Sequence, residues 1–111
     1  MNKTIKKIKD QLLNNPIILY MKGSPKIPTC GFSLKAVEIL KNCGEKFAYI
    51  DVIINNDIRI ELPKFSNWPT FPQLWINNKL IGGYDIMKEM QKNGELKLLI
   101  KKTIKKYNKK N

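Results

Sequence analysis

Short apolar runs alternate with amphipathic stretches along this chain. Runs of apolar residues bounded by Gly, Pro or Asn predict strands, and apolar side chains that recur every three or four residues predict helices. The predicted strands are residues 17–21, 47–52, 68–76 and 79–82. The predicted helices are residues 4–14, a segment after Cys30 that ends at Gly44, a segment from Asn55 through Phe65, a segment from Gly82 to Gly94, and the lysine-rich remainder.

Local signals set the expected boundaries. The pair Asn15-Pro16 should end the first helix, and Gly44 suits the position after the second. Asn55, Asn56 and Asp57 can cap the third helix, which Pro63 should end or kink. Asn77-Asn78 is a two-residue turn signal, so the last two strands should form a hairpin.

The order of these elements predicts an α/β fold. The first strand, the helix after Cys30 and the second strand form a βαβ unit, so these strands should be parallel with a right-handed crossover. The hairpin adds two antiparallel strands. We therefore expect a four-stranded mixed sheet flanked by helices on both faces, in a single domain covering residues 1–111 with a Lys-rich C-terminal helix and no internal repeat or linker.

Composition changes this picture in one respect, which is charge. The chain is 42% hydrophobic, enough for a core without disulfides, but its net charge is +12. Such a charge usually suggests nucleic acid or an anionic membrane. Here 20 of the 21 basic residues are Lys, and Lys, Asn and Ile share AT-rich codons, so genome bias is a sufficient cause. We expect a solvated basic helix face and no nucleic-acid partner.

The candidate chemistry centres on a single cysteine. Cys30 lies between the first strand and the second helix, where unpaired N–H groups and the helix dipole favour a thiolate. Ser33 occupies the position at which a C-x-x-C motif has its second cysteine. A buried structural cysteine is the alternative, but the Gly, Pro and Lys residues around Cys30 indicate an exposed loop. Cys43, at the far end of the same helix and roughly 20 Å away, cannot pair with it.

Other excluded classes follow from what the chain lacks. Without histidine there is no Cys–His nucleophile pair and no His-bearing zinc site. The sequence contains no signal-peptide core and no membrane-length apolar stretch. With two cysteines and no export signal, a cytoplasmic protein is expected.

Three further features could converge on Cys30, and Arg59 stands out separately by its residue type. Pro72, at a strand entry, is a candidate for a cis peptide bond, although an ordinary trans proline is the commoner case. Gly82-Gly83 before a helix offers N–H groups to a carboxylate, or is a simple turn. Lys22 follows the first strand, yet is one of twenty lysines. Arg59 is the single arginine, and its planar fork binds carboxylates in a way Lys cannot copy.

Three motifs together resemble a known family. They are Met21-Lys-Gly-Ser-Pro followed by Cys30-Gly-Phe-Ser33, Trp68-Pro-Thr-Phe-Pro-Gln-Leu74, and Gly82-Gly-Tyr-Asp85. The chain resembles monothiol glutaredoxins of the CGFS type from about residue 3 to residue 107. The resemblance implies a thioredoxin-like fold that binds glutathione and, as a glutathione-bridged homodimer, a [2Fe–2S] cluster.

The resemblance also implies roles for individual residues. Cys30 would be the cluster ligand and the site of any glutathione mixed disulfide. Lys22 and Arg59 would hold the glycine carboxylate of glutathione. The backbone of Thr70 and Phe71, before a cis Pro72, would pair with the tripeptide, and Gly83, Tyr84 and Asp85 would receive its γ-glutamyl end. Many relatives have Cys where this chain has Tyr84, so a second redox thiol near the site is absent.

Two functions compete on this basis. The preferred one is an iron–sulfur cluster carrier, because one thiolate per chain is too few for a cluster and two chains with two glutathiones supply four. The alternative is a weak glutathione-dependent thiol–disulfide oxidoreductase that uses Cys30 alone. Apo iron–sulfur proteins would be recipients, and the resemblance makes a BolA-family protein a plausible partner.

Overall fold

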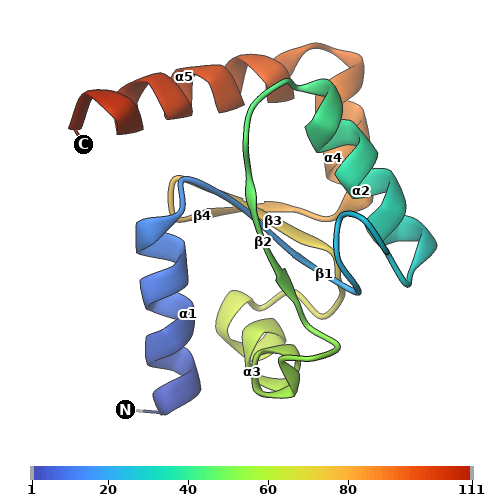
Figure 1. Cartoon of the computed structure of the whole chain (residues 1–111), viewed down its shortest axis with the longest axis vertical. Coiled ribbons are helices and arrows are strands. Elements are labelled where there is room, and N and C mark those ends of the chain that lie inside the picture. The colour runs from blue at the N-terminus through green and yellow to red at the C-terminus, as the bar shows by residue number, and fades with distance from the viewer. Residues whose placement is uncertain (1, 111) are drawn as a thin grey trace.

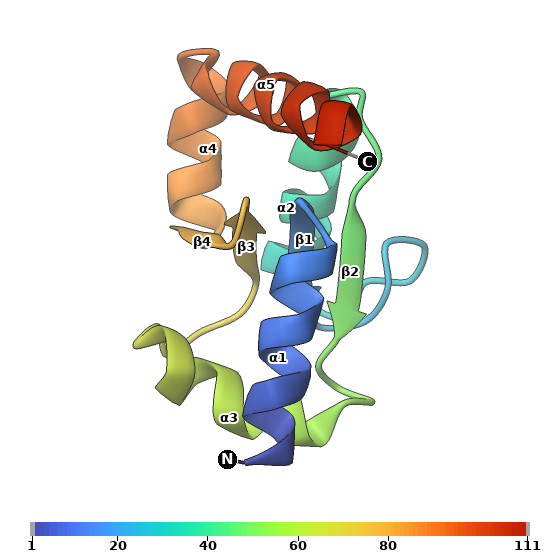
Figure 2. The ribbon, with the colours of Figure 1, turned by 90° about the vertical axis from the view of Figure 1, so that its left-hand side faces the viewer.

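The computed structural model describes residues 2–110, which form a mixed sheet between two layers of helices (Figures 1 and 2). The helices are α1 (Lys3–Asn14), α2 (Gly31–Asn42), α3 (Asn56–Ser66), α4 (Tyr84–Lys92) and α5 (Glu95–Lys110). The strands are β1 (Ile17–Met21), β2 (Ala48–Asp51), β3 (Gln73–Ile76) and β4 (Lys79–Gly82). Among these residues no helix is long and apolar enough to cross a membrane.

The sheet has the predicted mixed character. Its strand order is β2-β1-β3-β4, with β1 parallel to β2 and antiparallel to β3, and β3 antiparallel to β4. All five residues of β1 are buried, as expected of a central strand covered on both faces. Asn77 and Asn78 turn the β3–β4 hairpin with φ of 51° and 64°, the left-handed values that a two-residue turn requires.

Alternate residues of β1 point into two separate cores. Ile17, Leu19 and Met21 pack against α2, α4 and α5. Ile18 and Tyr20 pack against α1 and α3 on the other face. The period of two along the strand therefore divides the helices into two layers, as Figure 1 shows.

The third helix departs from expectation in two ways. Of the two outcomes expected at Pro63, an end or a kink, the helix does not end there: it continues to Ser66, whose hydroxyl donates to the Leu62 carbonyl (2.8 Å) within the last turn. Asn55 is the N-cap residue, but its side chain accepts no hydrogen bond from the helix. It donates instead to the Asp51 carbonyl (2.9 Å), so tertiary and loop contacts override the expected cap.

Candidate functional site

The loop before Cys30 is closed by backbone bonds that require a glycine. The Thr29 N–H donates to the Lys22 carbonyl (3.1 Å), and Gly23 pairs with Pro28 in an isolated bridge. Gly23 has φ of +90°, and a Cβ there would lie 2.5 Å from the Ile27 carbonyl oxygen. A side chain at this position would force the loop apart, so the sequence permits this turn only because residue 23 is Gly.

A carboxylate ties this loop to the neighbouring strand. One oxygen of Asp51, at the end of β2, accepts hydrogen bonds from the N–H groups of Gly23 (3.0 Å) and Ile53 (2.9 Å). Asp51 is not among the residues predicted from the sequence to form the site. The available signal was an acidic residue at the carboxyl end of a strand parallel to the one that precedes the cysteine loop.

Cys30 is the N-cap residue of α2, with extended backbone dihedrals and a partly exposed side chain. The backbone N–H of Ser33 is the largest cause that lowers the pKa of the Cys30 thiol below its ordinary value. Partial burial opposes this effect, while the N–H of Phe32, the Lys22 ammonium and the Ser33 hydroxyl reinforce it. The helix terminus therefore enriches the thiolate, the form that attacks electrophiles and binds metals.

Ser33 has a structural task that its sequence position did not reveal. Its side chain is fully buried, and its hydroxyl oxygen accepts a hydrogen bond from the Lys22 N–H (3.1 Å). The serine therefore joins the start of α2 to the end of β1. It also leaves Cys30 without a second thiol in the first turn of the helix.

A cavity of about 250 Å³ lies next to the start of α2. It contains six of the residues proposed from the sequence: Thr70, Phe71, Pro72, Gly83, Tyr84 and Asp85. The Phe71–Pro72 peptide bond is cis, as anticipated. Phe32 and Trp68 complete much of the wall. The loop before β3 and the N-terminus of α4 thus meet at Phe32, two residues after Cys30, although Cys30 and Lys22 do not themselves line the cavity.

Two details of the cavity wall were not predicted. The side chain of Gln73 is buried and donates to the carbonyl oxygens of Trp68 (2.9 Å) and Thr70 (3.3 Å), which holds the loop in shape. Trp68 has a buried indole N–H with no hydrogen-bond partner among residues 2–110. A Cβ on Gly83 would lie 3.7 Å from that nitrogen, so the indole N–H lies close to the Gly83 backbone in the cavity wall.

Tyr84 forms the aromatic side of the cavity. Its ring lies 5.8 Å from the Phe32 ring, centroid to centroid. The ammonium groups of Lys35 and Lys88 lie 5.4 Å and 6.0 Å from the same ring centroid. Two positive charges therefore lie in cation–π contact with Tyr84 at this side of the cavity.

The two basic residues proposed for the site differ in position. Lys22 is half-buried at the end of β1 and close enough to lower the pKa of Cys30 by its charge. Arg59 is exposed on α3 and does not line the cavity. Its guanidinium forms no ion pair with any residue from 2 to 110. Arg59 is thus available to an external anion but is not held in place by the protein.

The second cysteine does not contribute to this site. Cys43 is buried at the C-cap of α2, and burial raises the pKa of its thiol. Both cysteines are free. Within the described part of the chain, no three His, Cys, Asp or Glu side chains gather to hold a metal ion.

The fold and the site together define a thioredoxin-like protein with one partly exposed cysteine at the N-terminus of α2. Reduced apo GrxS14 from poplar has a similar structure, with a TM-score of 0.77, 38% identity, and coverage of 90% of this chain and 93% of that one. The glutaredoxin family model matches residues 17–81. Glutaredoxin 4 of Escherichia coli K12 is 61% identical over 107 residues, 96% of this chain and 93% of its own. The chain therefore belongs to the glutaredoxin family, and its Cys30-Gly-Phe-Ser33 motif places it in the monothiol branch.

Proposed function

We propose that this monothiol glutaredoxin binds glutathione beside Cys30 and carries a [2Fe–2S] cluster, as a glutathione-bridged homodimer, to apo iron–sulfur proteins in the cytoplasm. The observation that carries the proposal is the isolation of Cys30. Its pKa is lowered by the start of α2, yet a buried serine stands where a resolving thiol would be. A thiolate of this kind suits the binding of a transferable cargo better than a two-thiol redox cycle.

The cavity is suited to a peptide-like ligand with carboxylates. Thr70 and Phe71 would pair their backbone with the tripeptide, while Gly83, Tyr84 and Asp85 at the start of α4 would receive its γ-glutamyl end. Gly83 keeps this wall open, because a Cβ there would approach the Pro72 carbonyl oxygen to 3.3 Å. The unpartnered indole N–H of Trp68 adds a donor behind the same wall. Lys22 and Arg59 would neutralise the glycine carboxylate.

The count of thiolates supports a dimer. Clusters of this type commonly have four thiolate ligands, and one chain offers a single exposed thiol. Two chains with two glutathiones would supply the set. A BolA-family protein in place of the second chain is a further proposal that the same ligand count accommodates.

Anaerobic reconstitution with iron, sulfide and glutathione tests the proposal. We expect visible absorption of a cluster to appear together with a dimer on size-exclusion chromatography, and both to require glutathione. Cys30→Ser should abolish the absorption, while Cys43→Ser, the matched thiol control, should preserve it. A stable cluster on a monomer without any low-molecular-weight thiol, or equal loss in both variants, would refute the proposal.

The lowered pKa of Cys30 also favours a second candidate, a glutathione-dependent thiol–disulfide oxidoreductase. In that case a mixed disulfide on Cys30 must be resolved by an external thiol. Ser33 has no thiol, and Cys43 lies at the far end of α2, too distant to attack the disulfide. A coupled glutathione-reductase assay distinguishes the two functions. We expect slow turnover, and turnover as fast as that of a dithiol glutaredoxin would favour the enzyme.

A further inference from the structure

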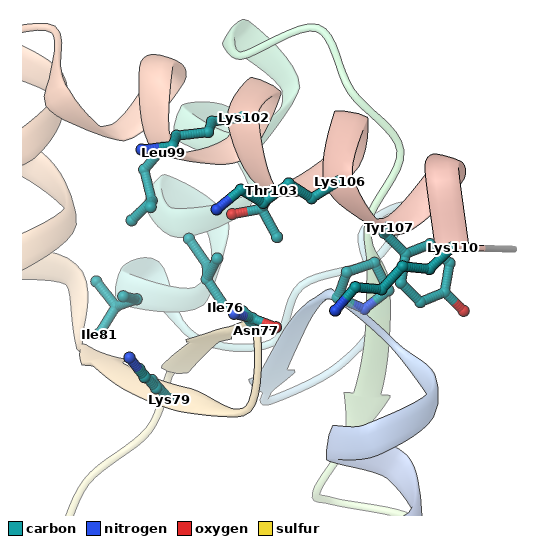
Figure 3. Close-up of a pocket in the computed structure, with 11 residues that line it drawn as sticks. Ile76, Asn77, Lys79, Ile81, Leu99, Lys102, Thr103, Lys106, Tyr107 and Lys110 are labelled. Atoms are coloured by element: carbon teal, nitrogen blue, oxygen red, sulfur yellow. The ribbon is translucent and has the colours of Figure 1, made fainter.

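A second cavity, of about 320 Å³, lies at the opposite end of the sheet from Cys30 (Figure 3). It opens between the C-terminal half of α5 and the β3–β4 hairpin. Its interior is largely apolar and includes Ile76, Ile81 and Leu99. The volume is near the lower end of the range found for ligand cavities, about 300–1,000 Å³. It is thus large enough for one or two apolar side chains.

Lysines line the rim of this cavity. Lys102, Lys106 and Lys110 recur every four residues, so they share one face of α5 in a row about 12 Å long. Lys79 stands across from them on the hairpin. No Asp or Glu lines the cavity, and none of these four ammonium groups forms an ion pair with residues 2–110.

The cavity lysines differ from a neighbouring lysine of α5 in having no acidic partner among residues 2–110. Lys101, on another face of α5, is paired with Glu45 at 3.0 Å. The lysines of the cavity repel one another without such relief, and an anion placed between them would reduce that repulsion. A ligand that complements this cavity would have an apolar group for the interior and negative charges for the lysines of the rim.

We propose that this lysine-rimmed cavity binds an acidic segment of a partner protein, with one apolar side chain inserted and carboxylates on the lysines. A row of 12 Å matches about four residues of an extended chain. A small anion would contact one or two of the four ammonium groups. Single-stranded nucleic acid would need an exposed aromatic surface, but Tyr107, the one aromatic residue that lines this cavity, is partly buried.

The position of the cavity keeps the two sites independent. Pro16 precedes β1 and lines this cavity, whereas Lys22 follows β1 and lies beside Cys30. A five-residue strand spans about 17 Å. A bound segment would therefore leave the Cys30 site open, and its binding does not depend on glutathione or on a cluster.

Fluorescence anisotropy with labelled peptides tests this proposal on the full chain. The probes are peptides in which Glu residues flank a central Leu, Ile, Met or Phe, with a peptide of equal charge and a central Ser as the control. We expect at least one apolar probe to bind about tenfold more tightly than the Ser peptide. Equal binding of all peptides, no binding at low salt, or tighter binding of an oligothymidine would overturn the proposal.

A matched pair of double variants locates the binding surface. Lys102→Glu with Lys106→Glu reverses two cavity lysines, and Lys105→Glu with Lys109→Glu makes the same change of charge on exposed lysines outside the cavity. We expect the first pair to weaken binding about tenfold and the second by less than about threefold. Equal weakening would mean non-specific attraction. A second measurement uses the unmodified protein: the NMR chemical shifts of the Ile81 and Leu99 amides should change when peptide is added. No change at saturating peptide would also contradict the proposal.

Discussion

The two ends of strand β1 are constructed differently: one leads into the Cys30 loop, and the other lies at the lysine-rimmed cavity. At the Cys30 end, Gly23, Ser33 and Asp51 hold the backbone by hydrogen bonds between distant segments. At the opposite end, α5 buries Leu96 and Ile100, while its second half is only partly buried or exposed. One end depends on exact backbone placement, and the other presents charges on a regular helix. Substitutions should therefore act strongly at the first end and weakly at the second.

The largest effect is expected for Gly23→Ala. The added methyl group would clash with the Ile27 carbonyl oxygen, and the alanine backbone would be held at an unfavourable φ of +90°. We therefore expect a loss of about 2–4 kcal/mol in the free energy of unfolding. Urea denaturation measures it. Gly31→Ala is the control, because a Cβ at residue 31 meets no atom within 4 Å. Equal stability of the two variants would show that the loop tolerates the clash.

Asp51→Ala should have the next largest effect. It removes the acceptor of two backbone N–H groups, which we expect to cost about 1–3 kcal/mol of unfolding free energy and to loosen the Cys30 loop. Hydrogen exchange at Gly23 and Ile53 should rise together. Asp10→Ala is the control, since Asp10 forms only an exposed pair with Lys6, worth about 0.3–0.5 kcal/mol. Unchanged exchange would mean that other contacts hold the loop.

At the lysine end, Tyr107→Phe should cost much less. It removes the exposed hydrogen bond from the Tyr107 hydroxyl to the Asn14 carbonyl oxygen, and such a bond contributes about 0.5–1.5 kcal/mol. The same urea titration measures this difference. A loss as large as that of Gly23→Ala would remove the contrast between the two ends.

The most local change concerns the charge beside Cys30. The Lys22 ammonium lowers the pKa of the Cys30 thiol, so Lys22→Gln should raise it. The pH at which alkylation by iodoacetamide reaches half its maximal rate should then move upward, and the rate at neutral pH should fall. Lys26→Gln, in the same loop and exposed, is the control. An unchanged pH profile would mean that the Lys22 charge does not contribute to the pKa of Cys30.

Much of the fold could be read from local signals. The apolar run of β1, the glycine after α2 and the Asn77-Asn78 turn each act within a few residues, and each was predicted correctly. The position of Pro72 at the entry to β3 made it a candidate for the cis bond that the structure has, but only the family resemblance implied cis over trans. Such features depend on short-range sterics, which a sequence displays directly.

The parts that could not be read depend on contacts across the fold. Asp51 bonds to a residue 28 positions away, and Ser33 to one 11 positions away. The continuation of α3 past Pro63 likewise depends on the fold, because Leu62 is buried in the core that α3 shares with α1 and β1. The roles of Lys22, Arg59 and the cavity residues toward glutathione stay predictions until ligand binding is measured.

The burial of Cys43 has a practical consequence for work on this protein. Its thiol is 3% exposed and its pKa is raised, whereas the Cys30 thiol is partly exposed with a lowered pKa. A maleimide fluorophore or spin label applied near neutral pH should therefore attach to the native chain at one point. The unaltered sequence thus provides a site-specific spectroscopic reporter at the start of α2, without any engineered cysteine.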